Sequence, residues 1–281
     1  MLAAVAAPLV ALVHHPLALE TGLAPEVAAA LVARERDNLA LARHILVPSP
    51  HTARVLMADY GVPEAKLTVV EPGVIRSAQT AVSKAEPPLI LSVGLQAARK
   101  GHDVLLRALA RLTDLDWQAV IVGRAHEAPV ARALVQLRGD LGVTDRVRLA
   151  GLLSDDEVQD LYRAARVFAL ATRYEGYGMV FAEALVHGLP IVSCRVGAVP
   201  DTVPGQAGLL VEAEDDRAFA EALRRVLCEA GMRQAMASAS DRAGLKLPDW
   251  DMQARRVGAV LEALTEGEVA VRRGIEPLFP G

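Results

Sequence analysis

From residue 88 onward, short runs of consecutive apolar residues alternate with longer segments of helical character. A strand that is apolar on both of its sides is buried on both faces, so this alternation predicts a parallel β-sheet covered by helices on either side. We expect strands at residues 89–93, 118–122, 147–150, 167–170, 191–193 and 208–211. The helices between and after them are expected at 103–112, 129–141, 155–164 and 179–187, followed by 217–229, 232–243 and 252–264.

A smaller set of elements precedes this sheet. Strands are expected at 9–13, 45–48 and 67–71, with helices at 25–43 and 49–60. Residues 75–87 are polar and unpatterned, which is typical of a linker. We therefore expect a domain at 1–74, a linker at 75–87, a second domain at 88–247 and a helical tail at 248–281. The chain opens in the middle of a pattern, which suggests that sequence is missing upstream.

Composition narrows the class of protein. The 281 residues are 52% hydrophobic, enough for two domains with large cores. A formal net charge of −4 argues against a nucleic-acid-binding surface. Two cysteines form no disulfide framework and fit a cytoplasmic protein. The apolar first 13 residues lack the positive region of a signal peptide and are too short to span a bilayer.

In an open parallel sheet, ligands bind beyond the carboxyl ends of the strands. Gly94 and Gly101 flank the loop after the first strand of the larger domain, and Arg99 and Lys100 add two cations next to an expected helix start. Such a loop can cradle a diphosphate, because helix N-termini offer free N–H groups to anions. A basic, solvated loop is the alternative explanation. Neither a Walker loop nor a G-x-G-x-x-G fingerprint is present.

The loop after the strand at 167–170 leads into a segment that carries two glutamates. Glu175 and Glu183 lie among small and apolar residues, and no Lys or Arg occurs between Glu175 and Pro190. An ionised carboxylate in apolar surroundings is costly unless it is paired. We therefore expect a ligand that donates hydrogen bonds, such as the hydroxyls of a sugar. A glycine-rich turn with a surface glutamate is the alternative for Glu175 taken alone.

These residues resemble a known family. The spacing from Glu175 to Glu183 is similar to the E-x7-E element of retaining GT-B glycosyltransferases. Within these enzymes, the chain resembles the large family of group 1 (family 4-like) glycosyl transferases. The resemblance extends, in the same order, over 71–74, 92–94, 99–102, 188–192, 196–197, 200–201 and 205–211. It implies an α/β fold of GT-B type, with two Rossmann-like domains. The N-terminal, acceptor-side domain would be incomplete and the C-terminal domain would bind the nucleotide-sugar donor.

The resemblance also implies roles. Lys100, with Arg99 beside it, would contact the diphosphate of the donor, and Glu183 would hydrogen-bond the ribose. Glu175 would meet hydroxyls of the transferred sugar, and His14 would lie close to the reacting sugar; these two are the candidate catalytic residues. The remaining candidate donor contacts are Gly94, Gly176, Tyr177, Gly178, Met179 and Val180. Retention of anomeric configuration is implied, with no cofactor and no required metal.

The chain departs from the family pattern in two ways. Leu95 stands where the family commonly has an arginine, which removes one diphosphate contact worth roughly 1.5–3 kcal/mol. The chain also begins after the family's first strand and glycine-rich loop. The acceptor half therefore resembles a truncated domain.

Three functions remain open on the sequence alone. The first is a retaining glycosyltransferase that moves a sugar from a UDP- or GDP-linked donor to an unknown glycan or lipid acceptor, in polysaccharide or glycolipid synthesis. The second is a catalytically incomplete, nucleotide-sugar-binding fragment of a longer glycosyltransferase. The third is a nucleotide-sugar 2-epimerase. A chain without transmembrane segment or nucleic-acid partner is expected in the cytoplasm, with peripheral binding to the inner face of the membrane as an alternative.

Overall fold

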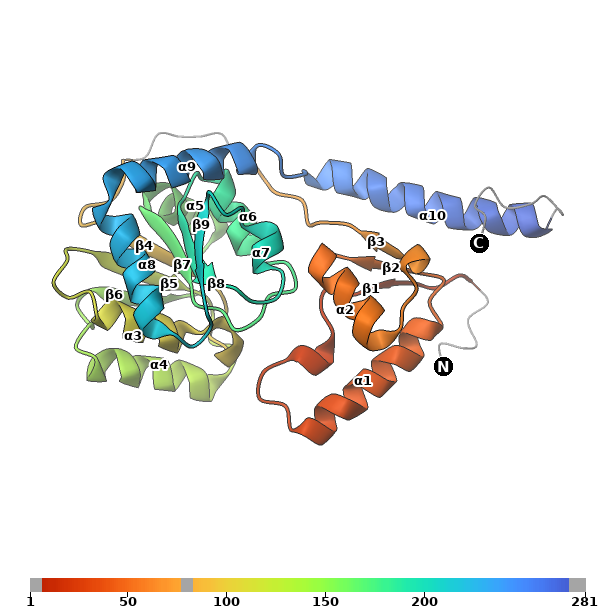
Figure 1. Ribbon diagram of the computed structural model, residues 1–281, viewed down its shortest axis with the longest axis horizontal. Coiled ribbons are helices and arrows are strands. Elements are labelled where there is room, and N and C mark those ends of the chain that lie inside the picture. Colours follow the sequence, from red (N-terminus) through yellow and green to blue (C-terminus); the bar gives the residue numbers. More distant parts are fainter. Residues whose placement is uncertain (1–6, 77–82, 273–281) are drawn as a thin grey trace. The chain divides into compact units, whose positions relative to one another are not determined.

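The computed structural model describes residues 7–76 and 83–272, which form two compact units (Figure 1). Within these residues, unit 1 comprises 7–18, 24–75 and 248–272, and unit 2 comprises 19–23, 76 and 83–247. The C-terminal segment, expected as a tail of its own, is therefore grouped with the N-terminal residues. Residues 77–82 of the expected linker and 273–281 of the expected tail lie outside the described residues.

Unit 2 is built on a six-stranded sheet in which every paired strand is parallel to its neighbour, in the order β6-β5-β4-β7-β8-β9. The α/β class with parallel sheets is confirmed. The strands are β4 (Leu89–Val93), β5 (Gln118–Val122), β6 (Val147–Gly151), β7 (Val167–Leu170), β8 (Ile191–Cys194) and β9 (Gly208–Val211). The chain adds strands on one side of β4 and then reverses to the other. The reversal between β4 and β7 is the topological switch point, where ligands of such sheets bind.

Helices cover both faces of this sheet, and each face has its own apolar core (Figure 1). One core gathers Leu105, Trp117 and Phe219, and the other gathers Tyr162, Phe168 and Phe181. The helices of unit 2 are η4 (Ala98–Lys100), α3 (His102–Ala110), α4 (Ala128–Asp140), α5 (Asp155–Ala164), α6 (Met179–Val186), α7 (Val199–Thr202), α8 (Asp216–Cys228) and α9 (Ala230–Gly244).

Unit 1 has a parallel three-stranded sheet in the order β1-β2-β3. Its strands are β1 (Val10–Leu12), β2 (His44–Val47) and β3 (Leu67–Val69), and its helices are η2 (Leu17–Leu19, whose last residue is grouped with unit 2), α1 (Pro25–Ala40), α2 (Pro50–Tyr60), η3 (Glu64–Lys66) and α10 (Trp250–Arg272). Ile45, Leu56 and Tyr60 belong to its core. The Ser49 hydroxyl accepts a hydrogen bond from the Thr52 amide at 3.0 Å and so caps α2, as the sequence predicts.

The differences from the predicted elements lie at the ends of helices and strands and in short helices. The helix expected at 103–112 is α3, from His102 to Ala110, and the helix expected at 252–264 is the longer α10. Helix α7 was not expected, because four residues are too few to show a helical period. No helix in the described ranges is long and apolar enough to cross a membrane.

Candidate functional site

The loops that follow β4 and β7 meet at the switch point of unit 2. Their contact involves backbone and side-chain atoms: the Arg173 amide donates to the Arg99 carbonyl at 2.8 Å, and the Thr172 hydroxyl oxygen lies 3.1 Å from the same carbonyl oxygen. The Arg173 guanidinium also donates to the Ala98 carbonyl and pairs with Asp103 at 3.0 Å. The loop with the predicted cations is therefore held against the loop with the first glutamate.

This contact pairs Glu175 with two cations. Lys100 Nζ donates to Glu175 Oε1 at 2.6 Å, and Arg99 Nη1 lies 3.7 Å from Glu175 Oε2. The Thr172 hydroxyl donates to Oε1 at 3.1 Å, and Arg99 Nη1 donates to the Tyr174 carbonyl at 3.0 Å. Glu175 itself is buried, with 5% of its surface exposed. The site therefore holds a carboxylate and two cations in a largely desolvated cluster.

The expectation that the partner of these glutamates is a ligand needs correction, because each carboxylate has a partner inside the protein. It rested on the lack of Lys or Arg between residues 175 and 190. The cations come instead from a loop 75 residues earlier, because β4 and β7 are neighbours in the sheet although β5 and β6 separate them in the chain. Glu183 also has a partner inside the protein, the hydroxyl of Tyr162.

Two glycines allow this packing. Gly101 has a φ of 60°, and a Cβ there would lie 1.8 Å from the Ala171 carbonyl oxygen, so no other residue fits without movement of the backbone. Gly178 has a φ of 86° and precedes α6, where a Cβ would lie 2.5 Å from the Phe181 ring. Both glycines stand directly before helices. The free N–H groups at the starts of α3 and α6 thus belong to segments that follow β4 and β7, where they can bind an anion.

His102 packs beneath the fold surface and contacts the loop that follows β4. Its side chain is buried, and Nε2 lies 3.2 Å from the Gly94 carbonyl oxygen, to which it can donate a hydrogen bond. Burial lowers the pKa of His102 to about 4, so the ring is neutral at physiological pH. A neutral ring held inside the fold positions Gly94 and is unsuited to binding a phosphate by charge.

Glu183 lies on α6 and is half-buried. The Tyr162 hydroxyl donates to Glu183 Oε2 at 2.8 Å. Burial raises the pKa of Glu183, and the charge of Asp155 acts in the same direction, whereas the hydrogen bond from Tyr162 lowers it. Sequence reasoning missed Tyr162, and no signal in the sequence pairs this residue of α5 with a glutamate 21 positions later.

The other predicted residues fall into two groups. Gly176 and Tyr177 are buried in the loop after β7, where the Thr202 hydroxyl donates to the Tyr177 carbonyl at 2.7 Å. Met179 and Val180 are the first two residues of α6, and Met179 is exposed. His14 belongs to unit 1, where it is exposed just beyond the end of β1. The structure thus brings together the predicted donor-binding residues on the two loops of unit 2.

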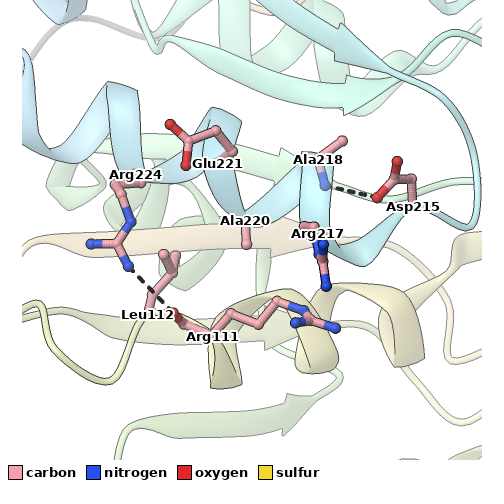
Figure 2. A pocket seen from close by; sticks show the side chains of 8 residues that line it. All are labelled: Arg111, Leu112, Asp215, Arg217, Ala218, Ala220, Glu221 and Arg224. Atoms are coloured by element: carbon pink, nitrogen blue, oxygen red, sulfur yellow. Dashed lines mark hydrogen bonds between the residues drawn. The ribbon is translucent and has the colours of Figure 1, made fainter.

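A hollow of about 460 Å³ lies between α3 and α8, apart from these residues. Figure 2 shows the side chains around it: Arg111, Leu112, Asp215, Arg217, Ala218, Ala220, Glu221 and Arg224. Two of its arginines are neutralised by neighbours, since Arg111 pairs with Asp216 at 2.8 Å and Arg224 with Asp114 at 2.6 Å. None of the predicted site residues lines it.

A site for a resident metal is not evident in the described ranges. No three or more His, Cys, Asp or Glu side chains of residues 7–76 and 83–272 gather closely enough to hold a metal ion.

Comparison with protein families gives two matches. Residues 87–229 match the family described as "Glycosyl transferases group 1", and residues 1–77 match "Glycosyltransferase Family 4". A D-inositol 3-phosphate glycosyltransferase of Thermobifida fusca is 32% identical over 73% of this chain and 52% of its own length. The enzyme of the same name from Xylanimonas cellulosilytica is 32% identical over 83% of this chain and 60% of its own. The chain thus spans little more than half the length of these relatives.

Solved structures show the same fold. A sucrose-phosphate synthase from Thermosynechococcus elongatus matches with a TM-score of 0.79 and 23% identity, over 92% of this chain and 68% of its own. HepE from Anabaena, solved in complex with UDP and glucose, matches with a TM-score of 0.78 and 18% identity, over 91% and 72%. The predicted GT-B fold is confirmed by this likeness.

Proposed function

The chain belongs to the group 1 glycosyl transferases, and from this membership we propose that unit 2 binds a nucleotide-diphosphate sugar, whose sugar the protein transfers with retention of anomeric configuration. The observation that carries the proposal is the ion pair of Lys100 with Glu175, at 2.6 Å. It joins a cation suited to a diphosphate and a carboxylate suited to sugar hydroxyls. Both stand beyond the switch-point strands, where such sheets bind their ligands.

The proposed chemistry depends on the leaving group. Breaking the bond between the sugar and the diphosphate leaves negative charge on the phosphate oxygens, and this charge must be stabilised in the transition state. Lys100 and Arg99 supply cations, and the starts of α3 and α6 supply N–H groups from the same edge. We propose that these groups meet the charge and that no metal is required.

The remaining roles are proposed from the family resemblance. Glu175 accepts hydrogen bonds from the transferred sugar and Glu183 from the ribose, while His14 of unit 1 serves near the reacting sugar. Gly94 and residues 176–180 supply backbone contacts to the sugar and the phosphates. Catalysis then consists mainly of positioning and leaving-group stabilisation.

Donor and acceptor are proposed from the relatives. HepE was solved with UDP and with UDP-glucose, which favours a UDP-linked donor over a GDP-linked one. The name shared by the curated relatives makes D-inositol 3-phosphate the first acceptor to assay. A larger glycan or lipid acceptor, used in polysaccharide or glycolipid synthesis at or near the cytoplasmic face of the membrane, is the second.

Calorimetric titration tests donor binding. UDP, UDP-glucose, GDP and GDP-mannose are titrated into the wild-type protein, the Lys100→Met variant and the Lys246→Met control, whose lysine is exposed in unit 2. Loss of one charge-assisted contact should weaken UDP-glucose binding by roughly ten- to a hundredfold in Lys100→Met and leave the control unchanged. A folded wild-type protein that binds no nucleotide, or a Lys100→Met variant that binds as the wild type does, would sink the proposal. Epimerised sugar formed without acceptor would point to an epimerase instead.

A further inference from the structure

We propose that Tyr162 is a positioning residue for nucleotide binding, because its hydroxyl holds the Glu183 carboxylate in the orientation that accepts hydrogen bonds from the ribose. The inference rests on the proposed function, which gives Glu183 the ribose as its ligand. It adds a residue that lies on another helix, α5, and that would act only through Glu183.

The position of the hydroxyl is fixed by packing. Tyr162 is fully buried, and its ring is stacked with the ring of Phe168, with centroids 5.9 Å apart, and with that of His187, at 4.9 Å. Its hydroxyl lies 2.8 Å from Glu183 Oε2 and 3.3 Å from the Val180 carbonyl oxygen. A fully buried ring packed against two other rings has little room to turn, so the hydroxyl approaches the carboxylate from a direction that packing defines.

Only one oxygen of the carboxylate is used by this contact. In the described part of the chain, no other side chain or amide hydrogen-bonds the Glu183 carboxylate. Oε1 is therefore left for a ligand, while Oε2 anchors the group. An ionised carboxylate accepts stronger hydrogen bonds than a protonated one, so the ribose contact also depends on the charge of Glu183.

The charge of Glu183 is set by a small number of neighbours. Burial and the carboxylate of Asp155, at the start of α5, raise the pKa of Glu183, and the Tyr162 hydrogen bond lowers it. Burial raises the pKa of Tyr162 well above its usual value, so its hydroxyl remains a donor throughout the physiological range. His187 contacts the Glu183 carbonyl at 2.8 Å, and the cations of Arg163 and Lys84 act on that ring. Without the Tyr162 hydroxyl, Glu183 should therefore take up a proton at a higher pH.

The test is the pH dependence of UDP-glucose binding, measured by calorimetry for the wild type and Tyr162→Phe. UDP-glucose is chosen because its diphosphate lacks the terminal phosphate group that titrates near pH 6 in UDP. Affinity should fall on acidification in both proteins, and the fall should begin at higher pH in Tyr162→Phe. At pH 6 this variant should bind roughly tenfold more weakly than the wild type, with a smaller gap at pH 8.5.

Two further variants separate positioning from packing. The glutamine in Glu183→Gln cannot take up a proton, so the affinity of this variant for UDP-glucose should not fall on acidification. The double variant Tyr162→Phe with Glu183→Gln should bind no worse than Glu183→Gln alone, since Tyr162 acts only through the carboxylate. This comparison still decides the matter if the single Tyr162→Phe variant fails to fold, because the double variant leaves no buried charge unpaired.

Tyr60→Phe is the matched control. It also removes a hydrogen bond from a tyrosine to a glutamate, Glu35 at 3.0 Å, but in unit 1, and it should keep the wild-type pH profile. The inference would be overturned if the affinity for UDP-glucose depended on pH in the same way in Tyr162→Phe and the wild type. It would also be overturned if the double variant bound UDP-glucose much more weakly than Glu183→Gln does. If the wild type binds UDP-glucose and only these comparisons fail, the proposed function stands; no binding at any pH overturns both.

Discussion

Replacing Lys100 by methionine should destabilise unit 2 even without a ligand. Methionine has a similar length and no charge, so the change leaves Glu175 without the ammonium group that now lies 2.6 Å from its Oε1. The carboxylate side chain is only 6% exposed and the lysine side chain 12%, so water cannot take the place of the lost partner.

The expected magnitude follows from these contacts. Removing one partner of a buried ion pair typically costs about 3–5 kcal/mol. Two contacts to Glu175 remain, from the Thr172 hydroxyl at 3.1 Å and from Arg99 at 3.7 Å. We therefore expect a loss somewhat below this range, about 2–3 kcal/mol in the free energy of unfolding. Most of it should return in the double variant Lys100→Met with Glu175→Gln, because the unpaired charge is then gone.

Urea unfolding, followed by tryptophan fluorescence, measures this loss in the free energy of unfolding. The chain has two tryptophans, and Trp250→Phe serves as the background because it leaves only Trp117, which is buried in unit 2. Asp160→Asn is the control: it breaks the ion pair with Arg163 at 2.7 Å, but its carboxylate is 68% exposed, so the change should stay below about 1 kcal/mol. A Lys100→Met variant as stable as the control, or a double variant no more stable than the single one, would refute the reasoning.

Three further predictions concern the loop after β4. Gly101→Ala should cost at least about 2 kcal/mol in urea unfolding, because a positive φ disfavours alanine and its Cβ would meet the Ala171 carbonyl. His102 takes up a proton in the unfolded chain below pH 6.5 but in the folded chain only near pH 4. Its burial should therefore lower stability by up to about 3 kcal/mol as the pH falls through this window, a loss that His102→Gln should lack when unfolding is measured at each pH. Leu95→Arg should restore the family's diphosphate contact and strengthen UDP-glucose binding roughly tenfold by calorimetry, with Leu95→Lys as a comparison that keeps the charge without the planar guanidinium.

Much of the fold could be predicted because the signal is local. The strands β4, β5, β7 and β9 have the predicted bounds, since each is a run of mainly apolar residues between polar or glycine-containing segments. Helix α7 and the 3-10 turn η4 have no such signal, because each is too short for a helical period to repeat.

The composition of the site could be predicted, but its pairing could not. Lys100 and Glu175 were both expected at one sheet edge, yet their direct contact requires β4 and β7 to be neighbours, and strand order is not visible in hydrophobic periodicity. The hydrogen bond from Tyr162 to Glu183 depends on how α5 and α6 pack over the sheet, which is a property of the assembled core.

Hydrogen–deuterium exchange with and without UDP-glucose tests most directly the claim that the switch-point loops bind the donor. Protection is predicted in two segments of unit 2, residues 94–102 and 175–180, and at a UDP-glucose concentration near the wild-type Kd it should be largely lost in Lys100→Met. Protection confined to the hollow between α3 and α8, around Arg111 and Arg224 (Figure 2), would contradict the claim, as would unchanged exchange in both loops at saturating UDP-glucose.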